Sequence, residues 1–432
     1  MHDPLETFHR YNTCQREHRP YSLKATSTHD TKRGEDVRAR INVLSEIPDS
    51  WQARLSRWMG WNGRRKKLWG NESVPDSDME MLIYQSMLGA WPFFSSELPE
   101  FKDRFKAYVI KAAREAKAYT GWLSINQEYE EALLNFTGAI LDLPAADRFM
   151  RDFLSLQKEI AYYGVFNSLS QVVLKVASPG VVDLYRGTEL WDLSLVDPDN
   201  RRPVDFDLRR SMMDEMDGEI DAATLRELML APEDGRIKLY AVTKALKTRM
   251  EYPDLFLNGD YLPLDASGEC RGHIAAFARR FEGWWALAVV PRLLTRLIER
   301  GSLPVGERPW AGTGLELPPD APRCWHNVFT GDSIERDECV RLPLSSVFRS
   351  FPVALLLGQK NRRHKGQGEY GRFQPSSQPS PVSAEGEAEI RSLSTATFFR
   401  SREKDKPAFG RFQLRPSFAP ARRRSECTDL PG

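Results

Sequence analysis

One stretch of the chain, from about residue 50 to residue 177, keeps a helical hydrophobic pattern throughout. Phe101, Phe105, Tyr108 and Ala112 recur at steps of three and four residues, the spacing that places side chains on one face of a helix. No strand pattern interrupts this stretch. The sequence therefore predicts a long all-helical region over residues 51–177.

Two short apolar segments flank the helical region, and each ends in polar residues. Residues 23–28 ("LKATST") favour a short buried strand, and His29 and Asp30 follow it. After the turn residues "SPG", residues 181–185 ("VVDLY") have the length and β-branched content of a second buried strand, which ends at "RGTE". From Glu35 the pattern after the first strand becomes helical, which predicts a strand–helix unit of an α/β fold.

The pattern changes again beyond the second strand. A helix is predicted from Ile237 to Arg249, and after it short apolar segments of period two lie between Gly, Pro, Asp and Asn residues. This arrangement is typical of an antiparallel sheet or sandwich. We therefore expect a small antiparallel β-sandwich domain over residues 238–358.

The last part of the chain, residues 359–432, differs in composition. It is rich in Ser, Pro, Gly and Arg and carries 15 Lys and Arg against 8 Asp and Glu. Such a composition is typical of disorder, so a disordered basic tail is predicted. A frameshifted or unrelated read-through would explain this tail.

The bulk composition argues against several classes of protein. A formal net charge of +1 gives no general reason to expect a nucleic acid or a membrane surface as a partner. No stretch reaches the roughly 18 uncharged apolar residues that a membrane span needs, and the N-terminus lacks an apolar signal segment. The five cysteines are widely spaced without a C-x-x-C pair, which indicates neither a disulfide framework nor zinc. We expect a soluble, cytoplasmic protein, and the sequence leaves its oligomeric state open.

His29 and Asp30 allow two interpretations. A carboxylate at the carboxyl end of a strand faces the edge of a parallel sheet where ligands bind, and a neighbouring His can donate to a ligand hydroxyl. Alternatively, Asp30 caps the next helix in a surface turn that leaves His29 exposed, and the dipeptide alone favours this turn. A similar choice concerns Trp58, Trp61 and Trp69, which either stack on sugars or pack in the helical core, and packing is favoured.

Four motifs decide the interpretation of His29 and Asp30, because together they match one family. They are "ATSTHDTKRGEDVRAR" at 25–40, "YQSMLGAWP" at 84–92, "KAAREAK" at 111–117 and "YRGTELWDLSLVDPDNRRPVDF" at 185–206. These motifs closely resemble the maltooligosyltrehalose synthases, a group within the alpha-amylase family. The resemblance extends over roughly residues 1–358 and favours a sugar site.

The resemblance implies a fold. In this family a (β/α)8 barrel carries a large helical insertion and precedes a β-sandwich domain. Residues 23–28 would be the seventh barrel strand and residues 181–185 the eighth, so the chain would hold the C-terminal end of a barrel with only its last two strands. Because two strands cannot close a barrel, we expect their edges to stay exposed and residues 1–45 to be poorly ordered. The implied parts are a barrel segment with strand seven (1–50), the helical insertion (51–177), strand eight with the following loops (178–237), the C-terminal β domain (238–358) and the tail (359–432).

The resemblance also implies a reaction. A maltooligosyltrehalose synthase is a (1→4)-α-D-glucan 1-α-D-glucosylmutase, an isomerase that converts the reducing-end α-1,4 linkage of a maltooligosaccharide into the α,α-1,1 linkage of trehalose. The transfer is a retaining intramolecular transglucosylation, in which one carboxylate attacks the anomeric carbon and a carboxylic acid protonates the leaving oxygen. Water must be kept out, because it would hydrolyse the intermediate. The maltooligosaccharide is the expected partner, and neither a metal nor an organic cofactor is implied.

By the same resemblance, Asp30 matches the carboxylate that stabilises the transition state, and His29 would bind a hydroxyl of the transferred glucose. The further predicted substrate-binding residues are Lys32, Arg33, Glu189, Trp191 and Asp192. Arg186 departs from the family, which usually has Gln there. Other polar residues of the motifs either bind sugar or hold loops, with neither role favoured: Asp197, Asp199, Asn200, Arg201, Arg202 and Asp205.

The family's nucleophile and acid have no counterpart in this chain. They follow the fourth and fifth barrel strands, upstream of the seventh, and only 21 residues precede Ser22. We therefore expect a partial enzyme that is inactive alone. Two alternatives stay open: a non-catalytic carbohydrate-binding or structural fragment, and another alpha-amylase-family hydrolase.

Overall fold

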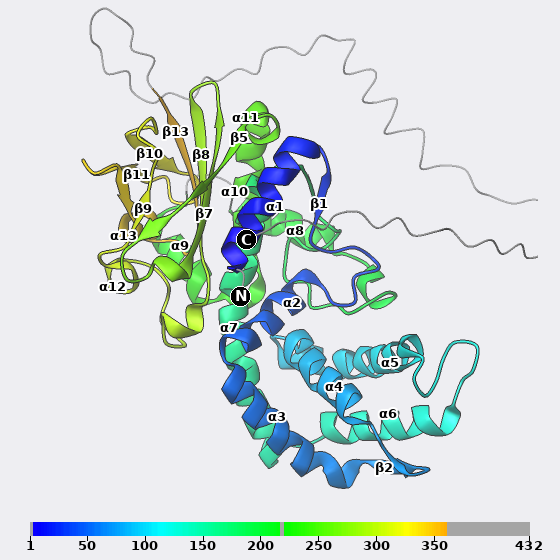
Figure 1. Ribbon diagram of the computed structural model, residues 1–432. Coiled ribbons are helices and arrows are strands. Elements are labelled where there is room, and N and C mark those ends of the chain that lie inside the picture. Colours follow the sequence, from blue (N-terminus) through cyan, green and yellow to red (C-terminus); the bar gives the residue numbers. More distant parts are fainter. Residues whose placement is uncertain (1–2, 217–219, 361–432) are drawn as a thin grey trace, which may run out of the picture. The chain divides into compact units, whose positions relative to one another are not determined.

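The computed structural model describes residues 3–216 and 220–360. Its first elements are helix α1 (Pro4–His18), strand β1 (Leu23–Ala25) and helix α2 (Glu35–Asn42), drawn in blue in Figure 1. Nearly all of the predicted tail, residues 361–432, lies outside the described residues. Short 3-10 helices lie between the longer elements: η1 (Val43–Glu46), η2 (Gly63–Arg65), η3 (Ser95–Glu97), η4 (Asp199–Arg201), η5 (Pro232–Asp234), η6 (Arg271–His273) and η7 (Leu294–Arg296).

Helix α1 contradicts the expectation that residues 1–45 are poorly ordered. The Arg16 guanidinium donates to the backbone carbonyls of Asn258 (2.6 Å) and Gly259 (2.8 Å), and His9 Nδ1 lies 2.8 Å from the Tyr261 hydroxyl. These contacts bind α1 to residues far away in the sequence. The sequence pattern did not reveal α1, because its polar side chains give little periodicity and its contacts are long-range.

The predicted helical region contains a short hairpin, so the prediction of uninterrupted helices is wrong. Strands β2 (Lys67–Trp69) and β3 (Glu72–Val74) pair antiparallel. Each strand has three residues, too few to show an alternating pattern. The remainder of the region is helical, with α3 (Pro48–Asn62), α4 (Ser77–Ala90), α5 (Leu98–Ala116), α6 (Gln127–Leu141) and α7 (Arg148–Ala177).

Aromatic side chains fill the core of the helical region. Trp58 of α3 is fully buried and packs edge-on against Tyr84, with ring centroids 5.5 Å apart. Its indole N–H donates to the Asp152 carboxylate (2.8 Å). Trp61 and Trp69 are half-buried against the same core. Trp58 therefore packs in the core, as the sequence favoured, and Trp61 and Trp69 also have packing contacts.

The two predicted strands flanking the helical region pair with each other. Strand β1 is parallel to β4 (Val181–Asp183), with Leu23 opposite Val181 and Ala25 opposite Asp183. The prediction that these strands are buried is wrong, because Leu23 is 71% and Val181 38% exposed. Within the described residues their sheet has no further strand, so its edges are open, as expected, and no closed barrel forms.

In the described parts of the segment between β4 and the β domain, the chain forms four α-helices. The helix predicted from Ile237 to Arg249 is confirmed as α10, which packs against α7. The four helices are α8 (Phe206–Glu215), α9 (Ala222–Leu230), α10 (Arg236–Glu251) and α11 (Pro253–Leu257).

The β domain contains two antiparallel sheets. One has six strands in the order β11-β10-β13-β8-β7-β5, and the other has three in the order β12-β9-β6. Its strands begin at Asp260, because α10 and α11 occupy most of residues 238–257. The strands are β5 (Asp260–Leu264), β6 (Ala266–Ser267), β7 (Ile274–Phe281), β8 (Trp284–Pro291), β9 (Gly314–Glu316), β10 (Cys324–Asn327), β11 (Ser333–Glu335), β12 (Arg341–Pro343) and β13 (Ala354–Gln359), with short helices α12 (Glu307–Trp310) and α13 (Leu344–Val347).

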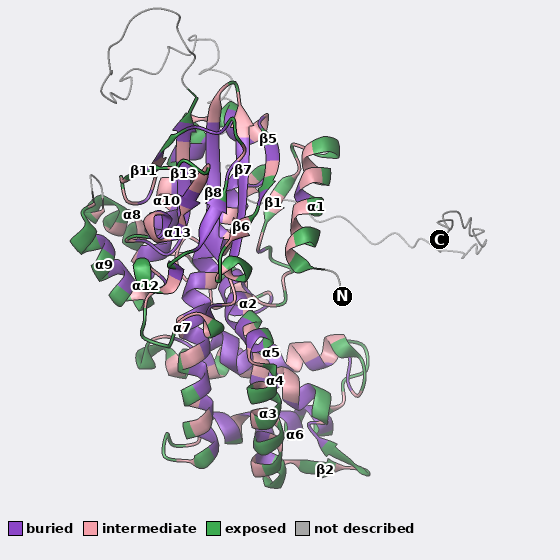
Figure 2. Ribbon diagram, turned by 60° about the vertical axis from the view of Figure 1, so that its left-hand side comes forward, coloured by how far each residue is buried: buried purple, intermediate pink, exposed green. Residues whose placement is uncertain are grey.

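The six-stranded sheet is covered on both faces. In β7, Ala275 and Phe277 pack with residues of α7 and α10, whereas Ile274 and Ala276 pack with residues of the three-stranded sheet. Successive side chains of a strand point to opposite faces, which explains the period of two in the sequence. Because both faces are covered, the central strands are almost wholly buried (Figure 2).

Candidate functional site

Two loops leave the same end of the parallel strands β1 and β4 and contact each other. The side-chain amide of Asn200 donates to the carbonyls of His29 (2.9 Å) and Thr28 (3.3 Å). The N–H of Gly34 donates to the carbonyl of Ser194 (2.9 Å). We call these two loops, residues 26–34 and 184–205, the lip. The first and last of the four sequence motifs thus lie side by side at the carboxyl ends of two parallel strands.

His29 and Asp30 are the central residues of a β-turn in the lip. The N–H of Thr31 donates to the Thr28 carbonyl (3.2 Å), which closes the turn. His29 Nε2 lies 3.3 Å from Asp30 Oδ2, and the two side chains are 52% and 85% exposed. Asp30 does not cap α2, because the N-cap is Gly34, which makes no side-chain bond. The pair therefore lies in a surface turn of the loop that follows β1. The strand ends at Ala25, earlier than the predicted residue 28, so each interpretation from the sequence was correct only in part.

Lys32 and Arg33 bind the lip to the helical region. Lys32 Nζ lies 2.5 Å from Glu115 Oε2, near the end of α5. The Arg33 guanidinium donates to the Ser86 hydroxyl of α4 (3.0 Å), and its backbone bridges to Leu195. Both predicted sugar-binding residues thus have protein partners that position the lip.

Glu189 and Trp191 also have partners within the protein. The Glu189 carboxylate accepts a hydrogen bond from Arg209 Nε (3.1 Å). The indole N–H of Trp191 donates to the Pro232 carbonyl (2.6 Å), which uses the only hydrogen-bond donor of that side chain. These contacts hold the second loop of the lip, and the roles of Glu189 and Trp191 in substrate binding stay predictions.

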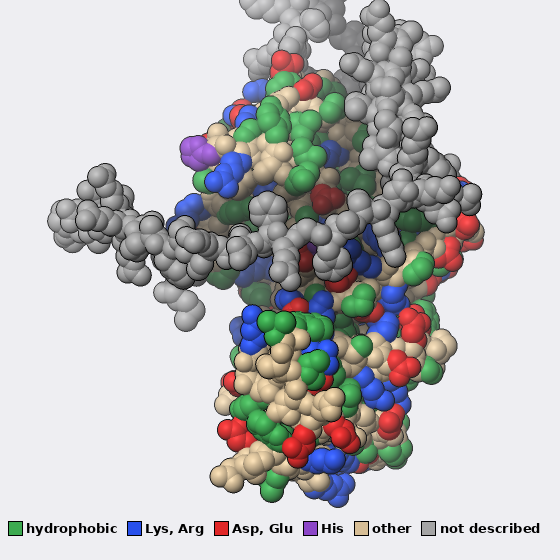
Figure 3. All heavy atoms as spheres, turned by 90° about the vertical axis from the view of Figure 1, so that its right-hand side faces the viewer, with side chains coloured by type: hydrophobic (Ala, Val, Ile, Leu, Met, Phe, Trp, Pro, Cys, Tyr) green, Lys and Arg blue, Asp and Glu red, His purple; other side chains and the backbone are tan. Residues whose placement is uncertain are grey.

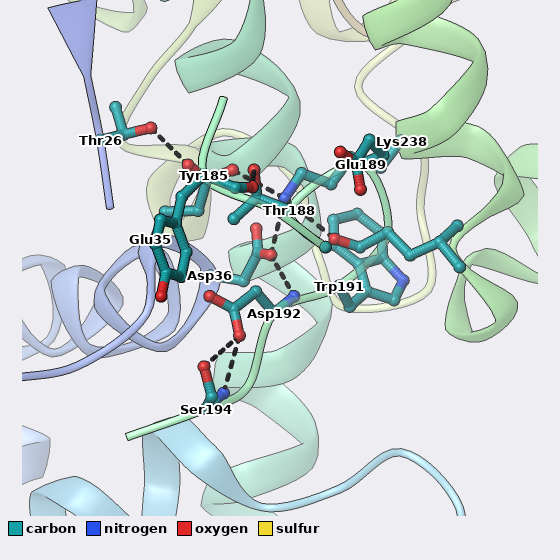
Figure 4. A network of polar contacts seen from close by, with 12 residues as sticks. Thr26, Glu35, Asp36, Tyr185, Thr188, Glu189, Trp191, Asp192, Ser194 and Lys238 are labelled. Carbon is teal, nitrogen blue, oxygen red and sulfur yellow. Dashed lines mark hydrogen bonds and ion pairs between the residues drawn. The ribbon is translucent and has the colours of Figure 1, made fainter. Parts of the chain in front are cut away.

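Asp192 joins the second loop of the lip to helix α2, as Figure 4 shows. Its backbone N–H donates to Asp36 Oδ2 (2.7 Å), and its carboxylate accepts from the Ser194 N–H (3.1 Å). Gly34 approaches so closely that a Cβ atom there would lie 2.7 Å from Asp192 Oδ2. Only glycine fits this contact without displacing a loop.

The other polar residues of the last motif also hold the loop. Asp199 accepts bonds from Arg104 (2.9 Å to each oxygen) and from the Leu195 N–H (2.7 Å). For these residues the structure shows loop-holding contacts. The further pairs are Asp197 with Arg201, Arg202 with Glu100, Asp205 with the Leu208 N–H, and Arg186 with the carbonyls of Arg201 and Arg202.

A buried ionic cluster adjoins the lip, and we define it as Glu35, Asp36, Lys175 and Lys238. Lys238 Nζ lies 2.8 Å from Glu35 Oε1 and 2.7 Å from Asp36 Oδ2, and it donates to the Leu190 carbonyl (3.2 Å). Lys175 Nζ lies 3.3 Å from Glu35 Oε2. All four residues are buried. The cluster joins α2, α7 and α10 to the second loop of the lip (Figure 4).

Burial and charge compete in the ionic cluster. Burial opposes the ionisation of Glu35, but Lys238 and Lys175 outweigh it and lower the pKa of Glu35 to about 2. Burial raises the pKa of Asp36 in spite of Lys238, and the negative charge of Glu35 adds to this rise. Burial disfavours the charge of Lys238, yet Asp36 and Glu35 attract it strongly enough to raise its pKa. Attraction between the two lysines and the two carboxyl groups therefore holds this buried cluster together.

Lys175 and Lys238 were not predicted as site residues from the sequence. Each lies within an apolar helical stretch, "VVLKVA" for Lys175 and "RIKLYAV" for Lys238. A lysine is almost never fully buried without a partner. A lone lysine on an apolar helix face is thus the signal that predicts a buried ion pair.

The described residues offer neither a membrane span nor an evident metal site. None of their helices is both long and apolar enough to cross a membrane. No group of three or more His, Cys, Asp or Glu among them is arranged to hold a metal ion. On the described part of the face in Figure 3, basic and acidic side chains are interspersed.

Comparisons with known proteins identify the relatives of the chain. No protein-family model matches it. It is 33% identical over 338 residues to a "Putative maltooligosyl trehalose synthase" of Mycobacterium tuberculosis (strain ATCC 25618 / H37Rv), and the match covers 78% of this chain and 38% of that protein. The maltooligosyltrehalose synthase structure from Arthrobacter ramosus is 32% identical with a TM-score of 0.65, and the match covers 82% of this chain and 41% of that one.

A further solved maltooligosyl trehalose synthase is 30% identical, with a TM-score of 0.62, and the match covers 82% of this chain and 42% of that one. The chain thus spans about two-fifths of the length of these relatives. The resemblance that its motifs indicated is confirmed: over about four-fifths of its length, this chain is homologous to the maltooligosyltrehalose synthases.

Proposed function

We propose that the lip forms one side of the sugar site of a maltooligosyltrehalose synthase. In this proposal the site converts the reducing-end α-1,4 linkage of a maltooligosaccharide into an α,α-1,1 linkage. The observation that carries the proposal is the meeting of two family motifs at the carboxyl ends of parallel strands, where Asn200 holds the backbone of His29. Ligands of α/β proteins bind at this end of the strands.

Asp30 and His29 would act directly on the sugar. The Asp30 side chain is 85% exposed, and its ion-pair partner His29 is 52% exposed, so both are accessible to a ligand. A carboxylate beside the anomeric carbon stabilises the positive charge of an oxocarbenium-like transition state. The His29 ring would donate to a hydroxyl of the same glucose.

We infer that the chain alone does not complete the reaction. A retaining transfer needs a nucleophile and an acid about 5 Å apart and a site closed to water. Asp30 is open to solvent, and the other carboxylates of the lip are held by protein partners. The nucleophile and the acid would then come from residues outside the described parts of this chain.

A second candidate function is sugar binding without catalysis. The open exposure of His29 and Asp30 favours it, because water reaches the pair freely. Both candidates predict that the chain binds maltopentaose. They differ in whether the lip supports turnover once the rest of a synthase is present.

A chimera tests the proposal. Residues 1–358 of this chain would replace the matching segment of a full-length maltooligosyltrehalose synthase, and loss of reducing ends from maltopentaose would be followed. We expect turnover by the chimera, none by the chain alone, and none by the chimera with Asp30→Asn. The matched control is Asp207→Asn, since the Asp207 side chain is 91% exposed on α8. Turnover that survives Asp30→Asn refutes the role of Asp30, and turnover by the chain alone refutes the inference of a partial enzyme.

A further inference from the structure

A cavity of about 670 Å³ lies between the loop after α4, helix α7, and residues 232–233 and 300–301. This volume falls within the range of small-molecule sites. None of the predicted site residues lines the cavity. Its walls are unusually aromatic, with Trp91, Phe93, Phe94 and Tyr162.

Two largely buried residues of the cavity wall carry a polar group that has no protein partner among the described residues. Gln157 of α7 is 6% exposed and Trp91 is 8% exposed. Among the described residues, neither the Gln157 amide nor the Trp91 indole N–H takes part in a hydrogen bond with another protein group. Neither group is among the side-chain polar atoms that are sealed from solvent, so both are open to the cavity. A ligand that offers hydroxyl groups at this place would satisfy both.

One ring is open for stacking. Phe94 is 48% exposed, whereas the Trp91 ring packs against Phe101 and Phe153 with centroids 5.4 and 4.9 Å apart. Phe93 lies 6.2 Å from Trp191 of the lip, centroid to centroid. The cavity therefore presents an exposed aromatic face near the lip without being part of it.

The charges of the cavity favour a neutral ligand. The charged residues in its wall, Lys158, Glu233 and Arg300, are all exposed, so they stand in solvent at its rim. An ionic ligand would meet no buried counter-charge among these wall residues and would lose its hydration. A glucose unit has an apolar ring face for Phe94 and hydroxyls for Gln157 and Trp91, and it carries no charge.

We propose that this cavity is a second carbohydrate-binding site, which holds a stretch of an α-1,4-glucan away from the lip. The aromatic wall and the unpartnered amide indicate a neutral hydroxylated ring. The choice of an α-1,4-glucan among such ligands rests on the proposed function.

Hydrogen–deuterium exchange of the full chain with maltohexaose tests the proposal. We expect protection of residues 91–98 at the cavity and, separately, of residues 26–34 at the lip. Two cavity variants are compared, Phe94→Ala and Gln157→Met, of which the second keeps the shape of the buried side chain. Each should raise the sugar concentration needed to protect residues 91–98 about tenfold. Protection of 26–34 should not change in either variant.

The control is Trp122→Ala, since Trp122 is 53% exposed and lies outside both the cavity wall and the lip. It should leave both protections as in the unaltered chain. Protection of 91–98 that is absent, or unaltered in both cavity variants, overturns the second site whether or not 26–34 is protected. Protection at 91–98 alone, lost in the variants, supports the cavity and argues against sugar binding at the lip.

Discussion

Two of the three carboxylates in the motif that begins the lip, Asp30 and Asp36, lie in opposite surroundings. The Asp30 side chain is 85% exposed and pairs only loosely with His29 at 3.3 Å. Asp36 is 2% exposed, and its carboxylate lies 2.7 Å from Lys238 Nζ and accepts the Asp192 N–H. A carboxylate that must act on a ligand is left accessible, whereas Asp36, which holds the site together, is bonded through Oδ2 to groups inside the protein.

The difference shows what a motif match alone does not. Carboxylates that hold the fold and carboxylates that are accessible to a ligand occur in the same motif. A substitution of either kind would impair the protein, either in its stability or in its binding. A buried carboxylate that loses its counter-charge destabilises the fold, whereas an exposed one that is neutralised affects only what binds to it. Stability and binding measurements therefore separate the two kinds of residue.

Lys238→Met should give the largest effect, because it leaves Asp36 and part of Glu35 buried without a counter-charge. We expect the free energy of unfolding to fall by about 3–5 kcal/mol, measured by urea denaturation. Lys158→Met, at an exposed position of α7, is the control and should change stability by about 0.5 kcal/mol or less. An equal loss in the two variants would show that the ionic cluster contributes no more than a surface charge.

The pH dependence of stability should identify Glu35. Its pKa is about 2 in the folded protein against the ordinary value of 4.5. A lowered pKa means that the stabilisation is fully present above pH 4.5 and is lost as the pH falls toward 2. The loss is on the order of 3 kcal/mol. Glu35→Gln should remove this part of the acid sensitivity.

Asp36 has the opposite effect on the pH dependence of stability. Because its pKa is raised in the folded protein, the folded state takes up this proton before the unfolded state does, which stabilises the fold as the pH falls. Glu35→Gln also removes the negative charge that adds to the rise of the Asp36 pKa, so the comparison measures the coupled pair. The measurement is urea unfolding at a series of pH values between 5 and 2. Parallel stability curves for the two proteins would mean that Glu35 is not held ionised in the fold.

Local periodicity allowed much of the fold to be predicted. Helix α10 and the alternation in β7 follow from side chains that face one continuous core on each side. The hairpin β2–β3 was missed because its strands are too short for a pattern. The burial of β1 and β4 was predicted wrongly, because burial depends on neighbouring strands and not on the apolar character of the segment itself.

In the candidate site, too, local features could be predicted from the sequence, whereas tertiary contacts could not. The motifs predicted that His29 and Asp30 lie at the end of a strand, since strand and polar end are local features. The ionic cluster could not be predicted by spacing, because Glu35 is separated from Lys175 by 140 residues and from Lys238 by 203. The partners of Trp191 and Asp192 are likewise set by tertiary contacts, which a single sequence does not contain.

Asp30→Asn in this chain tests the exposed side of the comparison. The side chain makes no buried contact, so the free energy of unfolding should stay within about 0.5 kcal/mol of the unaltered value. If the carboxylate binds sugar hydroxyls, the dissociation constant for maltopentaose should rise about tenfold, as expected for a lost hydrogen bond to a charged group. Calorimetric titration measures the affinity. If Asp30→Asn lowers the free energy of unfolding but leaves the affinity for maltopentaose unaltered, Asp30 holds the fold and does not bind sugar.

Substitution of Asn200 should have the smallest effect. Asn200 neither belongs to the buried ionic cluster nor acts on a ligand, but it positions the exposed turn. Its amide holds the carbonyls of Thr28 and His29, so it positions the exposed turn without touching a ligand. Asn200→Ala should cost about 1 kcal/mol of stability and speed hydrogen exchange in residues 26–34. Asn135→Ala, at an exposed position of α6, should alter neither. If exchange in the turn is unchanged, the turn is held by the Thr28–Thr31 bonds alone, and the exposed pair would be ordered by its own loop instead of by the second motif.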